Sequence, residues 1–260
     1  MTPSEAVEHN LVEFFRHFAR SHASGELAEL DGTSIASSGL AFHMFNAAFF
    51  SKPVVEACDL EGRIDRAAGY LGREERRWAF WVSEDKLDGN LARKARNVFH
   101  RRDLRFAYRH PGMISENLAL PARPLPLLEI RRVADRRTRM EFTHINSAAF
   151  RIPFEWCVDL YDTDRLWEGA FTGYVGYAHG EAVSTAATLV AGKAVGVYAV
   201  ATLPERERQG YGEAMTRHAL EQAQASSGIR RSVLQATAAG LPLYRRMGYQ
   251  IVTHFQVFSA

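Results

Sequence analysis

Three strand-like runs joined by hairpin signals constrain the C-terminal half of this chain most strongly. Residues 169–178, 182–190 and 194–202 are rich in small, β-branched and aromatic residues, and the two short gaps contain Gly180 and Gly192. This spacing is typical of consecutive antiparallel strands. A glycine-containing segment and a helical pattern over residues 213–225 come next. The order predicts an antiparallel meander whose last strand leads through a glycine loop into a helix.

The glycine loop, residues 200–212, ends on Gly210-Tyr211-Gly212 at the start of the predicted helix. The first backbone amides of a helix are unpaired and lie at the positive end of its dipole, and glycines let a ligand approach them closely. The loop therefore predicts a phosphate or pyrophosphate site, to which Arg206 and Arg208 add charge. A Gly-x-Gly pair alone also serves as an ordinary tight turn, so this alternative stays open at this point.

Other well-known site patterns are absent from the sequence. A dinucleotide-binding fold places three glycines after the first strand of a βαβ unit, and a P-loop needs Gly-Lys-Ser or Gly-Lys-Thr. The sequence contains neither pattern, no metal-ligand spacing of His, Cys, Asp and Glu, and no Gly-x-Ser-x-Gly elbow. We therefore expect no metal and no serine hydrolysis.

A second motif follows the loop. Leu243-Tyr244-Arg-Arg-Met-Gly248-Tyr249 lies on a predicted short helix after a predicted strand. Together the two segments resemble the acetyl-CoA loop, Arg/Gln-x-x-Gly-x-Gly/Ala, and the later Leu-Tyr-x-x-x-Gly-Phe motif of the GCN5-related N-acetyltransferase (GNAT) superfamily. The resemblance covers residues 129–258. It implies an α/β (α+β) fold, in which helices flank a mixed, mostly antiparallel sheet.

The resemblance also implies an activity, transfer of an acetyl group from acetyl-CoA to the amine of a small-molecule acceptor by direct attack. The alternative is a domain that binds an acyl-CoA and senses it without catalysis. Glu207 favours this alternative, because it occupies the first position of the loop motif, where the family usually has Arg or Gln. Since the loop acts largely through main-chain amides, we expect Glu207 to weaken cofactor binding without abolishing it.

The family's functional positions map onto a definite set of residues. Tyr244 matches the tyrosine that donates a proton to the departing thiolate, although a tyrosine there also fits simple packing of a short helix. Thr237 stands where many relatives have an Asn near the cofactor. The implied cofactor-binding residues are Val200 and Thr202 for the pantetheine arm, Arg208, Gln209, Gly210, Tyr211 and Gly212 for the pyrophosphate, and Thr237.

The general base is not evident from the sequence. Many relatives carry a Glu on the strand before the loop, but residues 194–200 contain no carboxylate. The candidates elsewhere are Glu155, Asp159, Glu181 and His218, each of which also fits an ordinary solvated position.

Three prolines within residues 118–126 indicate a domain boundary, because proline removes backbone donors and disfavours helix. We expect an N-terminal α/β domain over residues 1–120 and the GNAT-like domain over residues 128–260. Residues 78–113 resemble a degenerate copy of the same fold, and an unrelated α/β domain is the alternative. Glu84, Asp85 and Asp88 lie where the copy would have its glycine loop, so we expect this half to repel a pyrophosphate.

Composition bounds the partners and the compartment. The net charge of +2 gives no general attraction to nucleic acid or to an anionic membrane. Two cysteines, Cys58 and Cys157, suggest no disulfide framework, and no stretch is apolar enough for a signal peptide or a membrane span. We expect a cytoplasmic protein with no nucleic-acid or membrane partner. The oligomeric state and the identity of the acceptor stay open.

Overall fold

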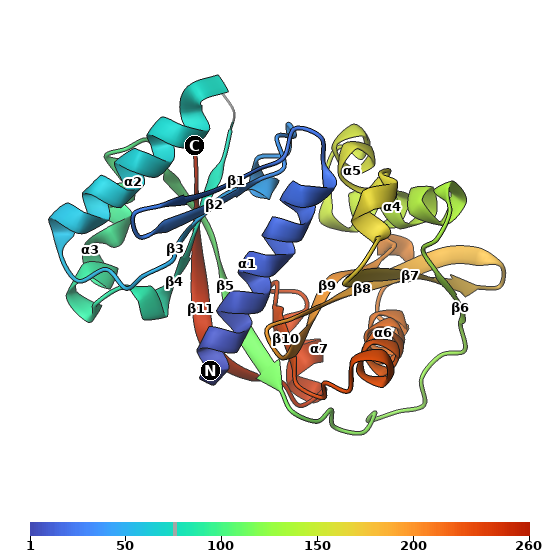
Figure 1. Cartoon of the computed structure of the whole chain (residues 1–260). Helices are drawn as coiled ribbons and strands as arrows, with labels where there is room; N and C mark the ends of the chain where they lie inside the picture. Colours follow the sequence, from blue (N-terminus) through green and yellow to red (C-terminus); the bar gives the residue numbers. More distant parts are fainter. Residues whose placement is uncertain (75–76) are drawn as a thin grey trace. The chain divides into compact units, whose positions relative to one another are not determined.

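The computed structural model describes residues 1–74 and 77–260, which form two compact units (Figure 1). The glycine-loop unit contains residues 1–11 and 113–250, and the N-terminal unit contains residues 12–112 and 251–260. The compact units are a different property from the predicted domains, residues 1–120 and 128–260, which are segments expected to fold on their own. The division into these two domains stays a prediction.

The sheet of the glycine-loop unit has the strand order β10-β9-β8-β7-β6. Neighbouring strands pair antiparallel except β9 and β10, which are parallel. The predicted meander is therefore present, and the prediction of a mixed, mostly antiparallel sheet is confirmed. The strands are β6 (Glu129–Arg132), β7 (Phe171–Ala178), β8 (Glu181–Ala191), β9 (Ala194–Thr202) and β10 (Ser232–Gln235).

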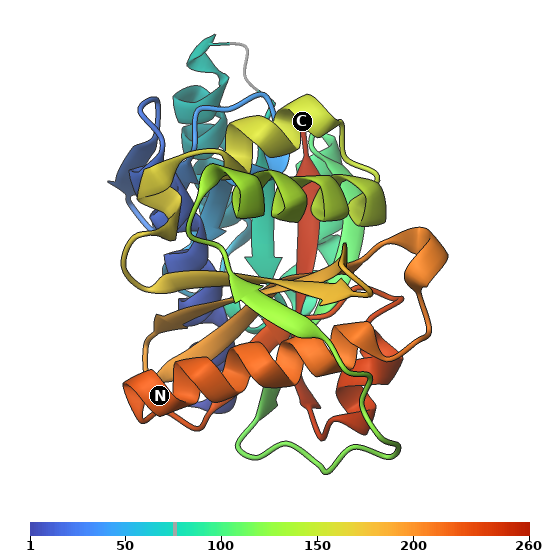
Figure 2. The same ribbon diagram turned by 90° about the vertical axis from the view of Figure 1, so that its right-hand side faces the viewer.

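Helices cover both faces of this sheet (Figure 2). Helix α6 (Tyr211–Ser227) packs on one face, where Met215 lies against Gly176. Helices α4 (Arg136–Phe150) and α5 (Phe154–Tyr161) cover the other face, where Phe142 and Trp167 lie against Gly173. A side chain at either glycine would collide with these residues. The short helix α7 (Leu241–Arg246) follows β10.

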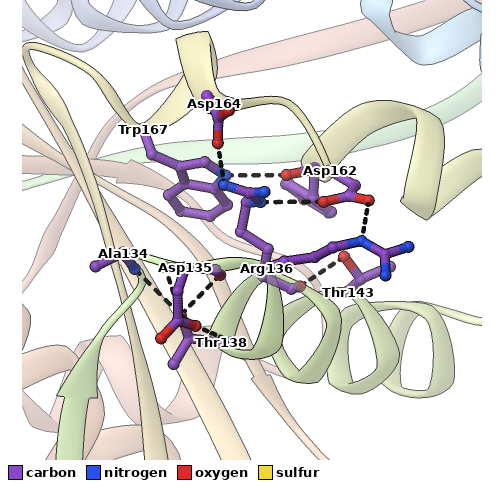
Figure 3. A network of polar contacts seen from close by, with 10 residues as sticks. Ala134, Asp135, Arg136, Thr138, Thr143, Asp162, Asp164 and Trp167 are labelled. Carbon is purple, nitrogen blue, oxygen red and sulfur yellow. Dashed lines mark hydrogen bonds and ion pairs between the residues drawn. The ribbon is translucent and has the colours of Figure 1, made fainter.

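A polar network fixes the start of α4 and the segment after α5 (Figure 3). Asp135 caps α4 through a capping box in which its carboxylate accepts from the Thr138 amide at 2.8 Å. Arg139 donates to Asp162 at 3.0 Å, and the indole of Trp167 donates to the Tyr161 carbonyl at 2.9 Å. The bond from Arg139 to Asp162 ties α4 to the segment after α5.

The N-terminal unit contains the strand order β1-β2-β3-β4-β11. Residues of α2 and α3 pack on one face of these strands, where Phe99 stacks on Phe258 at 4.0 Å. Helix α1 lies on the opposite face, where Phe15 contacts Phe49 and Trp81. The elements are α1 (Pro3–Ser21), β1 (Glu26–Leu30), β2 (Thr33–Ser37), β3 (Asn46–Phe50), α2 (Ala57–Leu71), β4 (Ala79–Ser83), α3 (Gly89–His100), β5 (Arg105–Ser115) and β11 (Gln250–Ser259), with α1 and β5 contributing to both units.

The turn between β4 and α3 differs from the glycine loop in one decisive way. The carboxylate of Asp88 caps α3 and accepts from the Asn90 amide at 3.0 Å. Glu84, in the same turn, accepts two bonds from Arg109, each of 2.7 Å, which hold the pKa of its carboxyl below the ordinary value. A helix start occupied by its own carboxylate is a poor site for a second anion.

Candidate functional site

The glycine loop leaves the start of α6 without a side-chain cap. Gly210 is the residue before the helix, with φ of 89°, in the left-handed region that favours glycine. It has no side chain to accept from the first helical amides, and no other side chain caps them in the described structure. The first turn of α6 is therefore available to an anion.

Strands β9 and β10 create the space in front of this helix start. They pair at Ser232–Val195 and Val233–Gly196, near the beginning of both strands. Farther along β9, residues from Val197 to Thr202 line a cavity of about 600 Å³ together with the loop, the start of α6 and α7. All lining residues belong to the glycine-loop unit.

The structure gathers most of the predicted site residues around this cavity. Gln209 is the exception, since it is exposed and does not line the cavity. The lining residues among the predicted set are Val200, Thr202, Arg208, Gly210, Tyr211, Gly212, Thr237 and Tyr244.

Tyr244 reaches the cavity from α7 and is almost fully buried, with 8% of its surface exposed. Its ring packs edge to face against Tyr249, with centroids 5.8 Å apart. Burial raises the pKa of the Tyr244 phenol well above its ordinary value of 10. The hydroxyl therefore keeps its proton at neutral pH and can donate a hydrogen bond.

Thr237 has a local role that the sequence did not indicate. Its hydroxyl accepts from the Gly240 amide at 3.1 Å, and its carbonyl accepts from the Leu241 amide at 2.9 Å. Thr237 therefore shapes the turn that leads into α7. Thr237 still lines the cavity. Gly240 lies beside both Thr237 and Tyr244, since a Cβ added there would be 3.4 Å from the Thr237 hydroxyl oxygen and 3.0 Å from the Tyr244 ring.

None of the four candidate bases lines the cavity. Glu155 and Asp159 are exposed on α5. Glu181 forms an ion pair with Arg206, and His218 packs edge to face on Tyr174 at 5.0 Å, where burial lowers its pKa.

Two other carboxylates do line the cavity, those of Glu207 and Glu213. Glu213 is held by Arg217, four residues along α6, at 2.8 Å. Arg217 also donates to the Ala119 carbonyl at 2.8 Å. The Glu213 carboxylate is therefore committed to a structural ion pair.

The cavity is strongly basic. Arginines from several segments line it, and one of them, Arg123, comes from the proline-rich segment that we interpreted only as a boundary. Its guanidinium lies 3.5 Å from the Arg208 carbonyl, and Pro126 lies 3.2 Å from where a Cβ on Gly210 would be. No local pattern identified Arg123, because its position depends on how residues 116–128 pass over α6. The lining arginines are Arg123, Arg151, Arg206, Arg208 and Arg246.

The described residues contain no group of three or more His, Cys, Asp or Glu side chains that could hold a metal ion. Among the helices of residues 1–74 and 77–260, none is long and apolar enough to cross a membrane. Both cysteines are free, with Cys58 exposed and Cys157 buried.

Comparison with known proteins supports the resemblance noted in the sequence. Residues 168–251 match the family model described as "Acetyltransferase (GNAT) domain". This segment includes β7 to α7 and most of the cavity lining, but not Arg123 or the lining residues 149–151. No curated protein matches the chain.

Solved structures share the fold over nearly the whole chain. A GCN5-related N-acetyltransferase from Kribbella flavida has a TM-score of 0.74 at 18% identity, with 98% of this chain and 94% of that chain covered. A functionally unknown conserved protein from Staphylococcus epidermidis has a TM-score of 0.63 at 13% identity, with 93% and 96% covered. A tandem GNAT protein from the clavulanic acid biosynthesis pathway has a TM-score of 0.54 at 9% identity, with 98% and 94% covered.

Proposed function

We propose that this chain, whose residues 168–251 match the GNAT acetyltransferase domain, transfers an acetyl group from acetyl-CoA to the amine of a small molecule. The observation that carries the proposal is the cavity in front of α6. It combines an uncapped helix start, glycines at Gly210 and Gly212, and a basic lining. These features suit the pyrophosphate of coenzyme A.

The proposed cofactor contacts follow from the chain's own groups. The amides around Gly210 and Gly212 bind the pyrophosphate, with Arg208 and Arg123 beside it. Backbone groups of Val200 and Thr202 pair with the pantetheine arm, because in the described part of the chain the pairing of β9 with β10 ends at Gly196. Gln209 is exposed, so its proposed contribution is limited to its main chain.

The proposed reaction forms a bond between the amine nitrogen and the acetyl carbonyl carbon and breaks the bond between that carbon and sulfur. The thiolate gains one proton and the amine loses one. We assign the first to Tyr244, whose phenol remains protonated at neutral pH, donates a hydrogen bond to the departing sulfur, and regains from solvent any proton that it gives up. Its raised pKa makes it a weaker acid than a thiol, for which the cysteine pKa of about 8.5 is the guide. The hydrogen bond to the sulfur in the transition state is therefore its main contribution.

The amine proton leaves through solvent in this proposal. The exposed candidates on α5 and the ion-paired Glu181 do not line the cavity, and Glu213 is held by Arg217. The acceptor consequently enters as the free amine, and after the attack its nitrogen loses one proton to water within the cavity. A cytoplasmic setting is part of the proposal, since both cysteines are unpaired.

The N-terminal unit is proposed not to bind the cofactor. Asp88 already caps α3, and Glu84 adds a second carboxylate to the same turn. This unit resembles a degenerate GNAT half, and its proposed role is to support the glycine-loop unit.

A second candidate function is an acyl-CoA sensor. The absence of a carboxylate from β9 and the presence of Glu207 in the loop favour it. Thiol release from acetyl-CoA across a panel of amines separates the two functions. Release matched by acetylated amine supports the transferase. Binding of acetyl-CoA without release for any amine supports the sensor, and no binding contradicts both.

A further inference from the structure

Strand β9 contains a strained residue at the cavity. Ala199 has φ of 48°, a left-handed conformation that costs an alanine about 1–2 kcal/mol. The strand bulges there, because Ala187 pairs with Tyr198 and Thr185 with Ala201, which leaves Ala199 and Val200 opposite a single residue of β8. Both of these residues line the cavity. Such strain persists only where the surroundings impose it.

The first support comes from α4 and β8. The hydroxyl of Thr185 donates to the Ala199 carbonyl at 2.8 Å. The same hydroxyl accepts from the side-chain amide of Asn146 at 3.1 Å. Both side chains are fully buried. Because the Asn146 amide already donates to the Thr185 hydroxyl oxygen, the proton of this hydroxyl is directed to the Ala199 carbonyl.

The second support comes from the N-terminal helix. The side-chain oxygen of Asn10 on α1 accepts from the Tyr198 hydroxyl at 2.7 Å. Its amide nitrogen lies 3.1 Å from the Ala194 carbonyl and 3.2 Å from that of Ala191. Asn10 is fully buried, and a Cβ on Gly196 would lie only 1.9 Å from its oxygen. Glycine at position 196 therefore makes this approach possible.

We propose that Thr185, Asn146 and Asn10 are positioning residues for acyl transfer. They fix the bulge at Ala199 and with it the orientation of the Val200 amide, which the GNAT resemblance implies as the donor to the thioester carbonyl. None of the three lines the cavity, so they act through the bulge. A donor of this kind is effective because it is fixed before the reaction, and losing one costs about 10² to 10³ in kcat. The inference rests on the proposed function.

Thr185→Val removes the hydroxyl at nearly constant volume. Thr143→Val is the matched control, because Thr143 is also fully buried and donates to a backbone carbonyl, that of Arg139, at 2.8 Å. Thr185→Val is expected to lower kcat at least tenfold and to leave the KM for acetyl-CoA within twofold. The control is expected to lose similar thermal stability and keep its kcat. Equal kcat in the two variants overturns the proposal.

Tyr198→Phe tests the second support, with Tyr177→Phe as its control. Tyr177 is also buried and its hydroxyl donates to a side chain, that of Glu141. We expect a fall in kcat with Tyr198→Phe only. A fall of the same size in both variants contradicts a role through the bulge.

Ala199→Gly provides a rescue. Glycine adopts positive φ without the penalty of alanine, so the bulge should depend less on the Thr185 hydroxyl. The double variant, Ala199→Gly with Thr185→Val, is expected to recover at least part of the lost kcat. A double variant no faster than Thr185→Val argues that the hydroxyl does not act through backbone geometry.

The NMR resonance of the Val200 backbone amide tests the inference without an amine acceptor. In the wild-type chain its chemical shift should differ between the coenzyme A and acetyl-CoA complexes, because only acetyl-CoA has the acetyl carbonyl. The difference should persist in Thr143→Val and shrink in Thr185→Val. An equal difference in both variants overturns the inference, whereas a wild-type chain that binds neither ligand contradicts the proposed function itself.

Discussion

Four residues that line the cavity have positive φ, namely Arg151, Ala199, Arg208 and Gly210, and only for Gly210 was this recognisable from the sequence. Gly210 stands out because it belongs to a Gly-x-Gly pair at the start of a predicted helix, and its φ of 89° lies in the region that favours glycine. Ala199 carries no such signal, since alanine has no preference for the left-handed region. Its conformation depends on Thr185 and on Tyr198, whose hydroxyl binds Asn10. Only the folded sheet brings these residues together.

Tyr244 is the residue whose proposed role is easiest to isolate. Tyr244→Phe keeps the ring and its packing on Tyr249 and removes only the hydroxyl. We expect kcat to fall about a hundredfold, the lower end of the usual range for a positioned acid, because the raised pKa weakens the donor. Affinity for acetyl-CoA, measured by calorimetry, should be unchanged.

Tyr249→Phe is the control for this variant, since Tyr249 is equally buried but does not line the cavity. It should keep kcat within a few fold. A near-normal kcat in Tyr244→Phe, measured where chemistry limits turnover, would show that Tyr244 only packs α7.

At the scale of elements, the meander was recognisable from its hairpin glycines and its small, β-branched and aromatic residues, although its strands are largely buried. Helix α6 was recognisable from its helical pattern, and both lie within a few residues of their expected bounds. Strands β2 and β3 were not predicted. All residues of both strands are buried, so their sequences show no alternation to recognise.

The proline-rich segment shows the same limit for the site. Its prolines correctly indicated a stretch without helix or strand, but its approach to the glycine loop is a tertiary property. Arg217 holds this segment by donating to the Ala119 carbonyl. A Cβ added to Gly248 would lie only 3.1 Å from the Ala119 amide nitrogen. This path brings Arg123 to the cavity.

Arg123→Gln is expected to weaken the binding of coenzyme A about tenfold, with a smaller dependence of Kd on salt, because a charge beside the pyrophosphate is lost. Dephospho-coenzyme A should lose affinity by the same factor, since it retains the pyrophosphate. Arg230→Gln is the control, because Arg230 also contacts the proline-rich segment, through Asn117 at 3.0 Å, without lining the cavity. An effect confined to intact coenzyme A would instead place Arg123 at the 3′-phosphate.

At the scale of the whole molecule, the site depends on segments far apart in the sequence. Residues 1–11 belong to the same unit as the glycine loop, and Asn10 satisfies backbone carbonyls of β8 and β9. A piece that starts at residue 128 would lack both Asn10 and Arg123. Point variants in the full chain therefore test the site better than separated halves.

Buried tyrosines predict how the whole chain responds to alkali. Burial raises the pKa of Tyr161, Tyr198, Tyr244 and Tyr249 in the folded state. Their stabilising contribution is complete below pH about 10, the pKa of an unfolded tyrosine, and declines as pH rises toward the folded value. Between these two pKa values, ionisation of each of these tyrosines in the unfolded chain alone lowers the free energy of unfolding by about 1.4 kcal/mol per pH unit. When the free energy of unfolding is measured with denaturant at pH 9 to 11, its decrease with pH should be smaller for Tyr161→Phe than for the wild type. An equal decrease in the two proteins would contradict the raised pKa of Tyr161.

Calorimetric titration of acetyl-CoA into the full chain and into Gly210→Glu tests the central claim most directly. Glutamate at position 210 combines a negative charge with a φ that only glycine adopts readily, in front of the amides proposed to hold the pyrophosphate. Gly228→Glu, at the other end of α6 with φ of 70° and open space around it, is the control. We expect one acetyl-CoA site per chain in the wild type and in the control, and none in Gly210→Glu. Binding that survives in Gly210→Glu, or two sites per chain, would contradict it.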